Sequence, residues 1–244
     1  MNTLPVHTPS LHCKVATARK TVALAILTTL AACAGTPRVP DWQIQAKSAM
    51  DRSVVAYLEG NERIEAAELM LARRQIASTG RTDLLAAAEL LHCATRVASL
   101  VFEPCARFEA LRLDATQDQH VYANYLRGQI IAGDIAQLPP AQRIATMHTA
   151  SDPSALRGID DPLSLLVAAG VLLQTGKANP AVIAQAVDTA SAQGWRRPLL
   201  AWLTVQEHHA RTAGQTDLAD RLLRRKAVAA GESHPRHNQE NSVQ

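Results

Sequence analysis

Apolar side chains recur along much of the chain at spacings of three and four residues, which is the pattern of amphipathic helices. Between residues 41 and 58, for example, Trp42, Ala46, Ala49 and Tyr57 would share one face of a helix. The same spacing, interrupted by glycine, proline or a polar cap, predicts further helices over residues 62–78, 82–103, 104–113, 117–131 and 141–149. Most of the chain after residue 40 is therefore expected to be helical.

The last third of the chain carries the clearest start and stop signals. Four helices are predicted there, between Asp161-Pro162 and Gly176, Asn179-Pro180 and Gly194, Pro198 and Gly214, and Thr216 and Gly231. Short loops place neighbouring helices antiparallel, so residues 161–193 and 198–230 should form two helical hairpins. The sequence thus predicts an all-α fold of antiparallel helical hairpins.

The two hairpins repeat at a nearly constant interval. Their opening residues, Asp161 and Pro198, are 37 positions apart, and the glycines between partner helices, Gly176 and Gly214, are 38 apart. Tetratricopeptide repeats favour small residues at certain spacings, and these spacings are matched by Ala210, Gly214 and Ala219. The arrangement resembles that family. The resemblance implies a solenoid-like array that presents an extended binding surface.

Prolines and glycines interrupt the helical pattern between residues 133 and 160. Pro139-Pro140, Asp152-Pro153 and Gly158 leave room for one short helix, so this segment is expected to connect two helical regions. After residue 231 the chain has one aliphatic side chain and no periodicity, which indicates a mobile tail. The predicted organisation is a helical region at 41–132, a connector at 133–160, a helical region at 161–231 and a tail at 232–244.

A basic, then apolar, then small-residue order precedes Cys33, as in an export signal. The uncharged residues 21–30 would span about 15 Å as a helix, against about 30 Å for a bilayer core, so they are too short for a stable membrane helix. Residues 1–32 are therefore expected to be a cleaved signal peptide. Its basic residues are Lys14, Arg19 and Lys20.

Leu30-Ala31-Ala32-Cys33 resembles the lipobox of bacterial lipoproteins. In that family the signal is cut before the cysteine, whose thiol then carries a diacylglyceryl group, so the resemblance implies lipidation of Cys33. It also implies sorting to the inner leaflet of an outer membrane, facing the periplasm, because Ala34 and not Asp follows the cysteine. Residues 33–40 would then be the lipidated cysteine and its tether, and residues 34–40 reach at most about 25 Å. The alternative is an ordinary cleaved signal with an incidental cysteine.

Composition favours helices and leaves the mature chain neutral. Hydrophobic residues make up 47% of the sequence and aromatic residues only 3%, which favours helices over sheets. The formal charge of +3 comes from 25 basic and 22 acidic residues, and three of the basic ones lie in residues 1–32, so removal of the signal leaves 22 of each. A neutral mature chain gives no support for nucleic acid as a partner.

Cys93 and Cys105 would be the two remaining thiols of an exported chain, which makes them candidates for a disulfide. On one unbroken helix they would lie about 18 Å apart, beyond the roughly 7 Å limit between bridged Cα atoms. A bridge therefore requires a turn, which Pro104 can supply. The alternative is a pair of buried thiols. Their spacing matches no metal site.

No catalytic, cofactor or metal motif is present in the sequence. The histidines of Glu207-His208-His209 would point about 100° apart on a helix and cannot converge on one ion. His234 and His237 lie in the predicted tail. Hydrolase and phosphate-loop signatures are absent, and spacing alone assigns no role to acidic residues such as Glu89, Glu103 and Glu109. We therefore expect no cofactor and no enzyme.

Two surface features are candidates for contact with a partner. Trp195, Arg196, Arg197 and Trp202 form the strongest aromatic cluster, which fits either an interface or a tryptophan packed between hairpins. A basic face on the last predicted helix could touch acidic groups or simply complement the helix dipole. Its residues are Arg221, Arg224, Arg225 and Lys226.

The sequence therefore predicts a lipid-anchored helical scaffold that binds a protein of the cell envelope. One alternative is an enzyme that acts on cell-wall material, which would need a deep pocket holding a carboxylate away from any arginine. Another is a binder of a small apolar ligand, which would need an enclosed cavity lined by Leu, Val and Ile.

Overall fold

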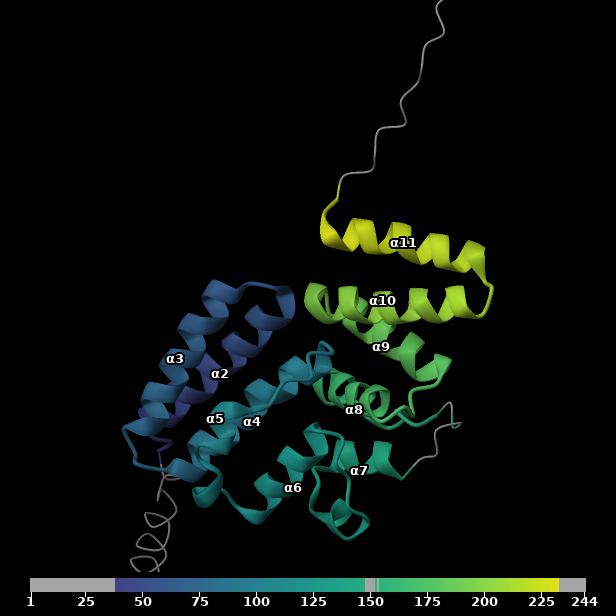
Figure 1. Ribbon diagram of the computed structural model, residues 1–244. Coiled ribbons are helices and arrows are strands. Elements are labelled where there is room, and N and C mark those ends of the chain that lie inside the picture. The colour runs from purple at the N-terminus through teal and green to yellow at the C-terminus, as the bar shows by residue number, and fades with distance from the viewer. Residues whose placement is uncertain (1–37, 148–151, 153, 233–244) are drawn as a thin grey trace, which may run out of the picture. The chain divides into compact units, whose positions relative to one another are not determined.

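The computed structural model describes residues 38–147, 152 and 154–232 (Figure 1). The predicted signal, Cys33 and most of the tether lie outside these residues, as do His234, His237 and nearly all of the predicted tail. The described residues from Asp41 onward belong to one compact unit. The described part of this unit is helical and contains no strand, so the predicted all-α class is confirmed. None of its helices has the length and apolarity needed to cross a bilayer.

The helices follow one another through short loops. In chain order they are α2 (Asp41–Glu59), α3 (Glu62–Ala77), α4 (Thr82–Ala98), α5 (Ala106–Glu109), the 3₁₀ helix η2 (Arg112–Asp114), α6 (Gln117–Leu126), the 3₁₀ helix η3 (Ala132–Gln137), α7 (Pro140–Thr146), α8 (Pro162–Gln174), α9 (Pro180–Ala192), α10 (Arg196–Thr212) and α11 (Thr216–Ala230).

The helices begin as predicted where a side chain caps them. Oδ2 of Asp161 accepts a hydrogen bond from the backbone N–H of Ser164 (2.7 Å), and Oδ1 of Asn179 accepts one from Val182 (3.0 Å), each ahead of a proline in the first turn. These bonds satisfy N–H groups that have no partner inside the helix. α10 begins at Arg196, two residues before the predicted start at Pro198, because a first-turn proline needs no N–H partner.

One boundary error lies at the end of α4. The sequence predicted a helix up to the break at Pro104, whereas α4 ends at Ala98 and the chain turns at Leu100, which has a positive φ of 62°. The backbone N–H groups of Leu100 and Val101 donate to the carbonyls of Val97 and Arg96 (both 2.9 Å), which closes the helix in the manner usually served by glycine. A leucine at this position gives no stop signal in the sequence.

The segments after α4 are also shorter than predicted. The helix predicted over residues 104–113 is reduced to α5 and η2, and the one predicted over 117–131 stops at Leu126. Gly128 lies just beyond that end with a φ of 71°, which makes it the stop signal in place of Gly133. The short helix predicted in the connector is α7, which ends at Thr146.

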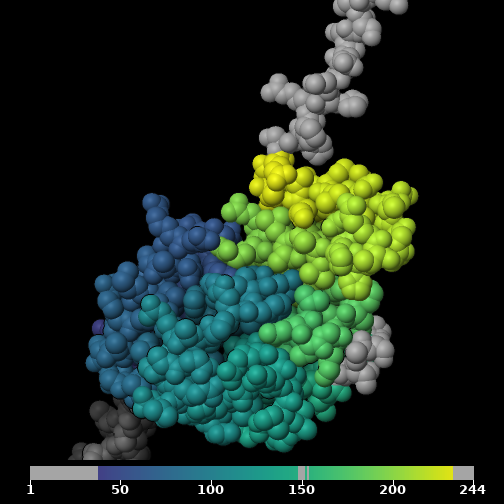
Figure 2. Space-filling view, viewed as in Figure 1, coloured from purple at the N-terminus to yellow at the C-terminus, as the bar shows by residue number. Residues whose placement is uncertain are grey.

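The helices pack as hairpins that are also joined across the fold. α2 packs on α3, α8 on α9 and α10 on α11, and α9 also contacts α10. In addition α4 packs on α8, and α10 contacts α2; Figure 2 shows the yellow-green surface of α10 and α11 adjoining the blue surface of α2 and α3. In a solenoid each repeat contacts only its neighbours. These two long-range contacts are therefore not those of a simple linear array.

One hydrophobic core crosses the predicted connector. It runs from Ala86 in α4 to Leu222 in α11 and includes Leu138 and Leu156 from the segment between the two predicted regions. A smaller cluster lies between α2, α3 and the start of α4. The main core thus joins α4 and α6 of the first predicted region to the second predicted region through described residues of the connector, whereas buried residues of α2 and α3 form the smaller cluster.

Candidate functional site

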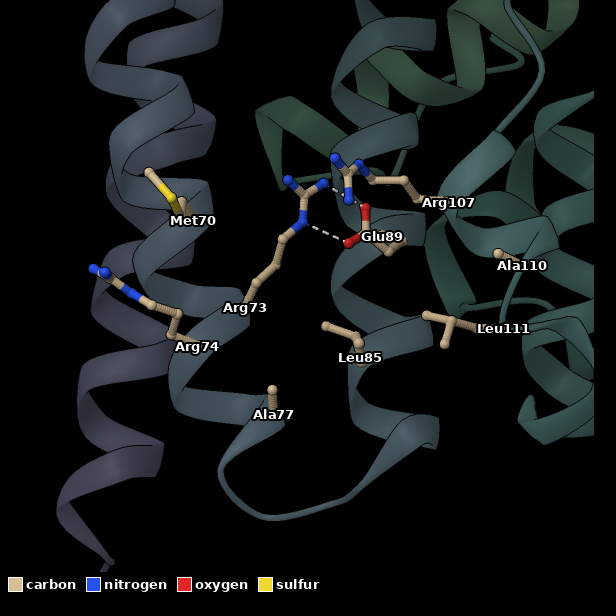
Figure 3. A pocket seen from close by; sticks show the side chains of 9 residues that line it. All are labelled: Met70, Arg73, Arg74, Ala77, Leu85, Glu89, Arg107, Ala110 and Leu111. Carbon is tan, nitrogen blue, oxygen red and sulfur yellow. Dashed lines mark hydrogen bonds and ion pairs between the residues drawn. The ribbon is translucent and has the colours of Figure 1, made fainter.

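A groove of about 360 Å³ lies between α3, α4 and the α5–η2 segment (Figure 3). α3 and α4 form one wall and the floor, and α5 with the residues after it forms the other wall. We call it the α3–α5 groove, and its lining residues are Met70, Arg73, Arg74, Ala77, Leu85, Glu89, Arg107, Ala110 and Leu111. Most of these side chains are apolar or alanine, so the charged ones determine its chemistry.

Glu89 is the buried carboxylate of this groove. Its side chain is 4% exposed, and Arg73 reaches it from α3 with Nε 2.6 Å from Oε1 and Nη2 2.7 Å from Oε2. Both carboxylate oxygens therefore accept a hydrogen bond from one guanidinium, which is the strongest geometry for such a pair. Burying a charged carboxylate without a partner destabilises a fold, and the pairing with Arg73 offsets this loss of stability at Glu89.

Two further arginines line the groove without such a partner. Within the described residues, neither Arg74 nor Arg107 takes part in an ion pair or a side-chain hydrogen bond. Figure 3 shows Arg107 reaching from α5 toward Glu89, opposite Arg73, while Arg74 extends from the outer side of α3. The groove therefore holds more positive than negative charge.

The neighbouring charges are already paired with one another. Nε2 of His92 lies 3.1 Å from Oε1 of Glu65, and Nη2 of Arg96 lies 2.8 Å from Oε2 of Glu103. Burial lowers the pKa of His92 below its usual value, and the adjacent Glu65 offsets part of that effect. None of these carboxylates is available to neutralise the unpaired arginines of the groove.

A disulfide holds the α5 wall in place. Cys93 of α4 and Cys105, which directly precedes α5, form a disulfide with Cα atoms 6.0 Å apart. The turn that brings them together lies at Leu100, earlier than the turn predicted at Pro104. Phe108 of α5 is fully buried in the main core beside this link. α5 is only four residues long, so these two contacts position its side chains.

A second cavity of about 360 Å³ lies on the other side of α4, against α6 and η3. Its walls include Leu90, Leu91 and Leu138, but Asp118, Gln119 and Gln137 also line it. The cavity opens to solvent, so it differs from the enclosed aliphatic cavity that a binder of a small apolar ligand requires.

The two tryptophans of the predicted aromatic cluster pack against the core of the fold. Trp202 is fully buried, and its Nε1–H donates to the carbonyl of Ala98 at 3.1 Å, so this residue belongs to the core and not to a surface for partners. Trp195 is half-buried against the same core. Of the two interpretations that the sequence left open, the external interface is therefore wrong for Trp202 and packing inside the fold is correct, because its N–H finds an internal acceptor.

The two arginines of that predicted interface join α10 to α2. Nε of Arg197 donates to the carbonyl of Tyr57 (2.8 Å), its guanidinium lies 4.5 Å from the centre of the Tyr57 ring, and its Nη2 is 3.1 Å from Glu62. Arg196 is exposed and lies against Gly60. Their contacts thus join the start of α10 to the end of α2 and the turn that follows it.

The other candidate side chains stay apart. Glu207 pairs with Arg211 along α10, and His208 and His209 are exposed, so they form no common site. On α11, Arg221, Arg224 and Arg225 are exposed, while Lys226 donates to Thr204. Across the described residues, no three metal-ligating side chains gather at one point.

The Glu89–Arg73 pair was missed at the level of sequence. Glu89 stands in the run Leu84-Leu85-Ala86-Ala87-Ala88-Glu89-Leu90-Leu91, and a single carboxylate inside such an apolar run signals a buried charge that needs a cation. The sequence does not identify that cation, because Arg73 lies on another helix. Nothing in the sequence around Arg107 indicates that this residue lines a groove.

No protein-family model matches the chain, and neither does any curated protein or solved structure.

Proposed function

We propose that the protein is a lipid-anchored adaptor of the bacterial cell envelope and that its α3–α5 groove binds a segment of another envelope protein. The adaptor has no catalytic role. Its location rests on the resemblance of Leu30-Ala31-Ala32-Cys33 to a lipobox, with the lipid on Cys33. Its binding role rests on the groove.

The observation that carries the binding role is the bidentate pair of Arg73 and Glu89. A carboxylate that acts as a general acid or base must be free to exchange a proton with its substrate. Both oxygens of Glu89 are instead occupied by Arg73. A cell-wall enzyme would need the opposite arrangement, so the pair supports a binding groove.

The remaining features of the groove also fit a protein segment. Its walls are apolar, it opens to solvent, and its deepest polar group is already satisfied. Sites for small molecules usually present several convergent polar groups that fix the orientation of the ligand. An open apolar groove that also contains charged groups instead resembles the grooves in which proteins bind segments of their partners.

Site-specific photocrosslinking in the native membrane tests this proposal. A photoreactive residue replaces Ala77 or Ala110, the small residues on the two walls of the groove, or Ala87, an exposed alanine in the second cavity. We expect the same discrete protein adduct from Ala77 and Ala110 and no such adduct from Ala87. Adducts that are equal at all three positions, or absent from both groove positions, would contradict a docking groove.

The same experiment in the Cys33→Ser background tests the anchor. Loss of the lipid should move the protein out of the membrane fraction and strongly reduce the adduct, because the partner is then no longer nearby. An unchanged mass and membrane fraction for this variant would show that Cys33 carries no lipid.

A further inference from the structure

We infer that the α3–α5 groove recognises an acidic side chain flanked by apolar residues on its partner. This inference rests on the proposed function and adds the chemistry of the bound segment. It is carried by the uneven charge of the groove and by the apolar surface around that charge.

At the centre of the groove there are two positively charged side chains and one negatively charged side chain. Arg73 and Arg107 approach Glu89 from opposite walls, so two guanidinium groups face one carboxylate (Figure 3). Arg73 donates two of its N–H groups to Glu89 and keeps three others, and Arg107 has no carboxylate partner within the described residues. A second carboxylate would therefore find both an uncompensated charge and unused donors.

Arginine favours a carboxylate here through geometry as well as charge. The planar guanidinium presents paired N–H groups whose spacing matches the two oxygens of a carboxylate. A side chain of Asp or Glu, or the carboxylate at the end of a chain, fits this requirement.

The surface around the arginines selects for apolar neighbours of that carboxylate. Ala77 and Leu85 lie on one side and Ala110 and Leu111 on the other, and Met70 is 54% exposed at the edge. Burying these atoms under apolar side chains of a partner is favourable. A flexible methionine also adapts to side chains of different shapes. A small hydrated anion would leave this surface uncovered, so a peptide segment fits it better.

Selection from a displayed library of random peptides tests the inference, with the full-length protein in detergent as the target. Enriched peptides should carry Asp or Glu next to Leu, Ile, Met or Phe. For a synthetic copy of the most enriched peptide, Arg107→Glu should weaken binding by about tenfold or more, because an attractive charge becomes repulsive. The matched control is Arg224→Glu, which reverses an exposed arginine on α11 and should leave the affinity unchanged.

The outcomes separate this inference from the proposed function. Enriched peptides without acidic residues, no enriched peptide at all, or equal affinity for the wild type and Arg107→Glu would overturn the acidic recognition. Groove-specific adducts from Ala77 and Ala110 would in that case still support the adaptor. A third outcome is that no peptide is enriched, while the wild type binds phosphatidylglycerol vesicles and Arg107→Glu does not. The ligand of the groove would then be a lipid surface and not a peptide, and the inference would be overturned.

Both variants are compared with the wild type by circular dichroism and thermal unfolding before binding is measured. Arg107 makes no ion pair within the described residues, so its reversal should leave the fold intact. An unfolded Arg107→Glu variant is replaced by Arg107→Gln, which should still weaken binding severalfold.

Discussion

At the scale of single residues, the fold depends on how buried polar groups are satisfied. The caps Asp161 and Asn179 were predictable, because each stands before a proline and an apolar run and its side-chain oxygen accepts from an N–H of its own helix. Glu89 shows the limit of such reasoning. Its need for a cation is visible in the sequence, but the choice of Arg73 depends on how α3 packs on α4.

Arg73→Met should destabilise the protein by about 3 kcal/mol, because it leaves the Glu89 carboxylate buried without a counter-charge. Urea unfolding followed by circular dichroism measures this loss. The control is the double variant Arg73→Met with Glu89→Met, which removes both charges and should recover most of the stability. A double variant that is less stable than the single one would contradict the account of an unpaired charge.

At the scale of elements, α4 organises the groove. One side of it carries Leu85 and Glu89 toward α3 and α5, and another carries Ala87, Leu90 and Leu91 toward the second cavity. The positions of most helices were predictable from periodicity and glycine stops. The end of α4 was not, because Leu100 adopts a backbone conformation that the sequence usually signals with glycine.

Reduction of the Cys93–Cys105 disulfide should destabilise the protein by about 3 kcal/mol through the loop-closure entropy of the unfolded chain. It should also speed hydrogen exchange in the short helix α5, because the link helps to hold that wall. Chemical unfolding with and without reductant, together with exchange measured by mass spectrometry, checks both effects. The Cys93→Ser/Cys105→Ser variant should behave like the reduced protein and should no longer respond to reductant.

At the scale of the whole helical unit, the fold class was predictable and the tertiary arrangement was not. Helical periodicity and short loops correctly indicated an all-α fold, and the adjacent pairs α8–α9 and α10–α11 pack together. Nothing in the periodicity indicates that α4 packs on α8 or that Arg197 bonds to the carbonyl of Tyr57. Such contacts depend on shape complementarity between segments far apart in the sequence.

Gly170→Ala should destabilise the whole unit by about 2 kcal/mol or more, since α8 approaches α4 too closely for a side chain. A Cβ atom at Gly170 would lie 2.5 Å from the carbonyl oxygen of Val97, so the two helices must move apart. Thermal unfolding should remain a single transition at a lower temperature, because both helices belong to one core.

The matched control is Gly133→Ala. Gly133 is not among the glycines with a positive φ, so alanine can adopt its backbone conformation. An added Cβ atom there would meet nothing within 4 Å. Its stability should equal that of the wild type or slightly exceed it. An equal loss in the two variants would mean that the close approach of α4 and α8 is not what makes Gly170 necessary.

Under the proposed function, the disulfide next to α5 would also set when the protein becomes competent to bind its partner. The thiols of an exported chain would stay reduced in the cytosol and be oxidised only after translocation. A freshly synthesised copy would therefore carry Arg107 on a loosely held wall and engage its client poorly, and oxidation would complete the recognition surface. Premature recruitment inside the cell would then be avoided without any dedicated inhibitor.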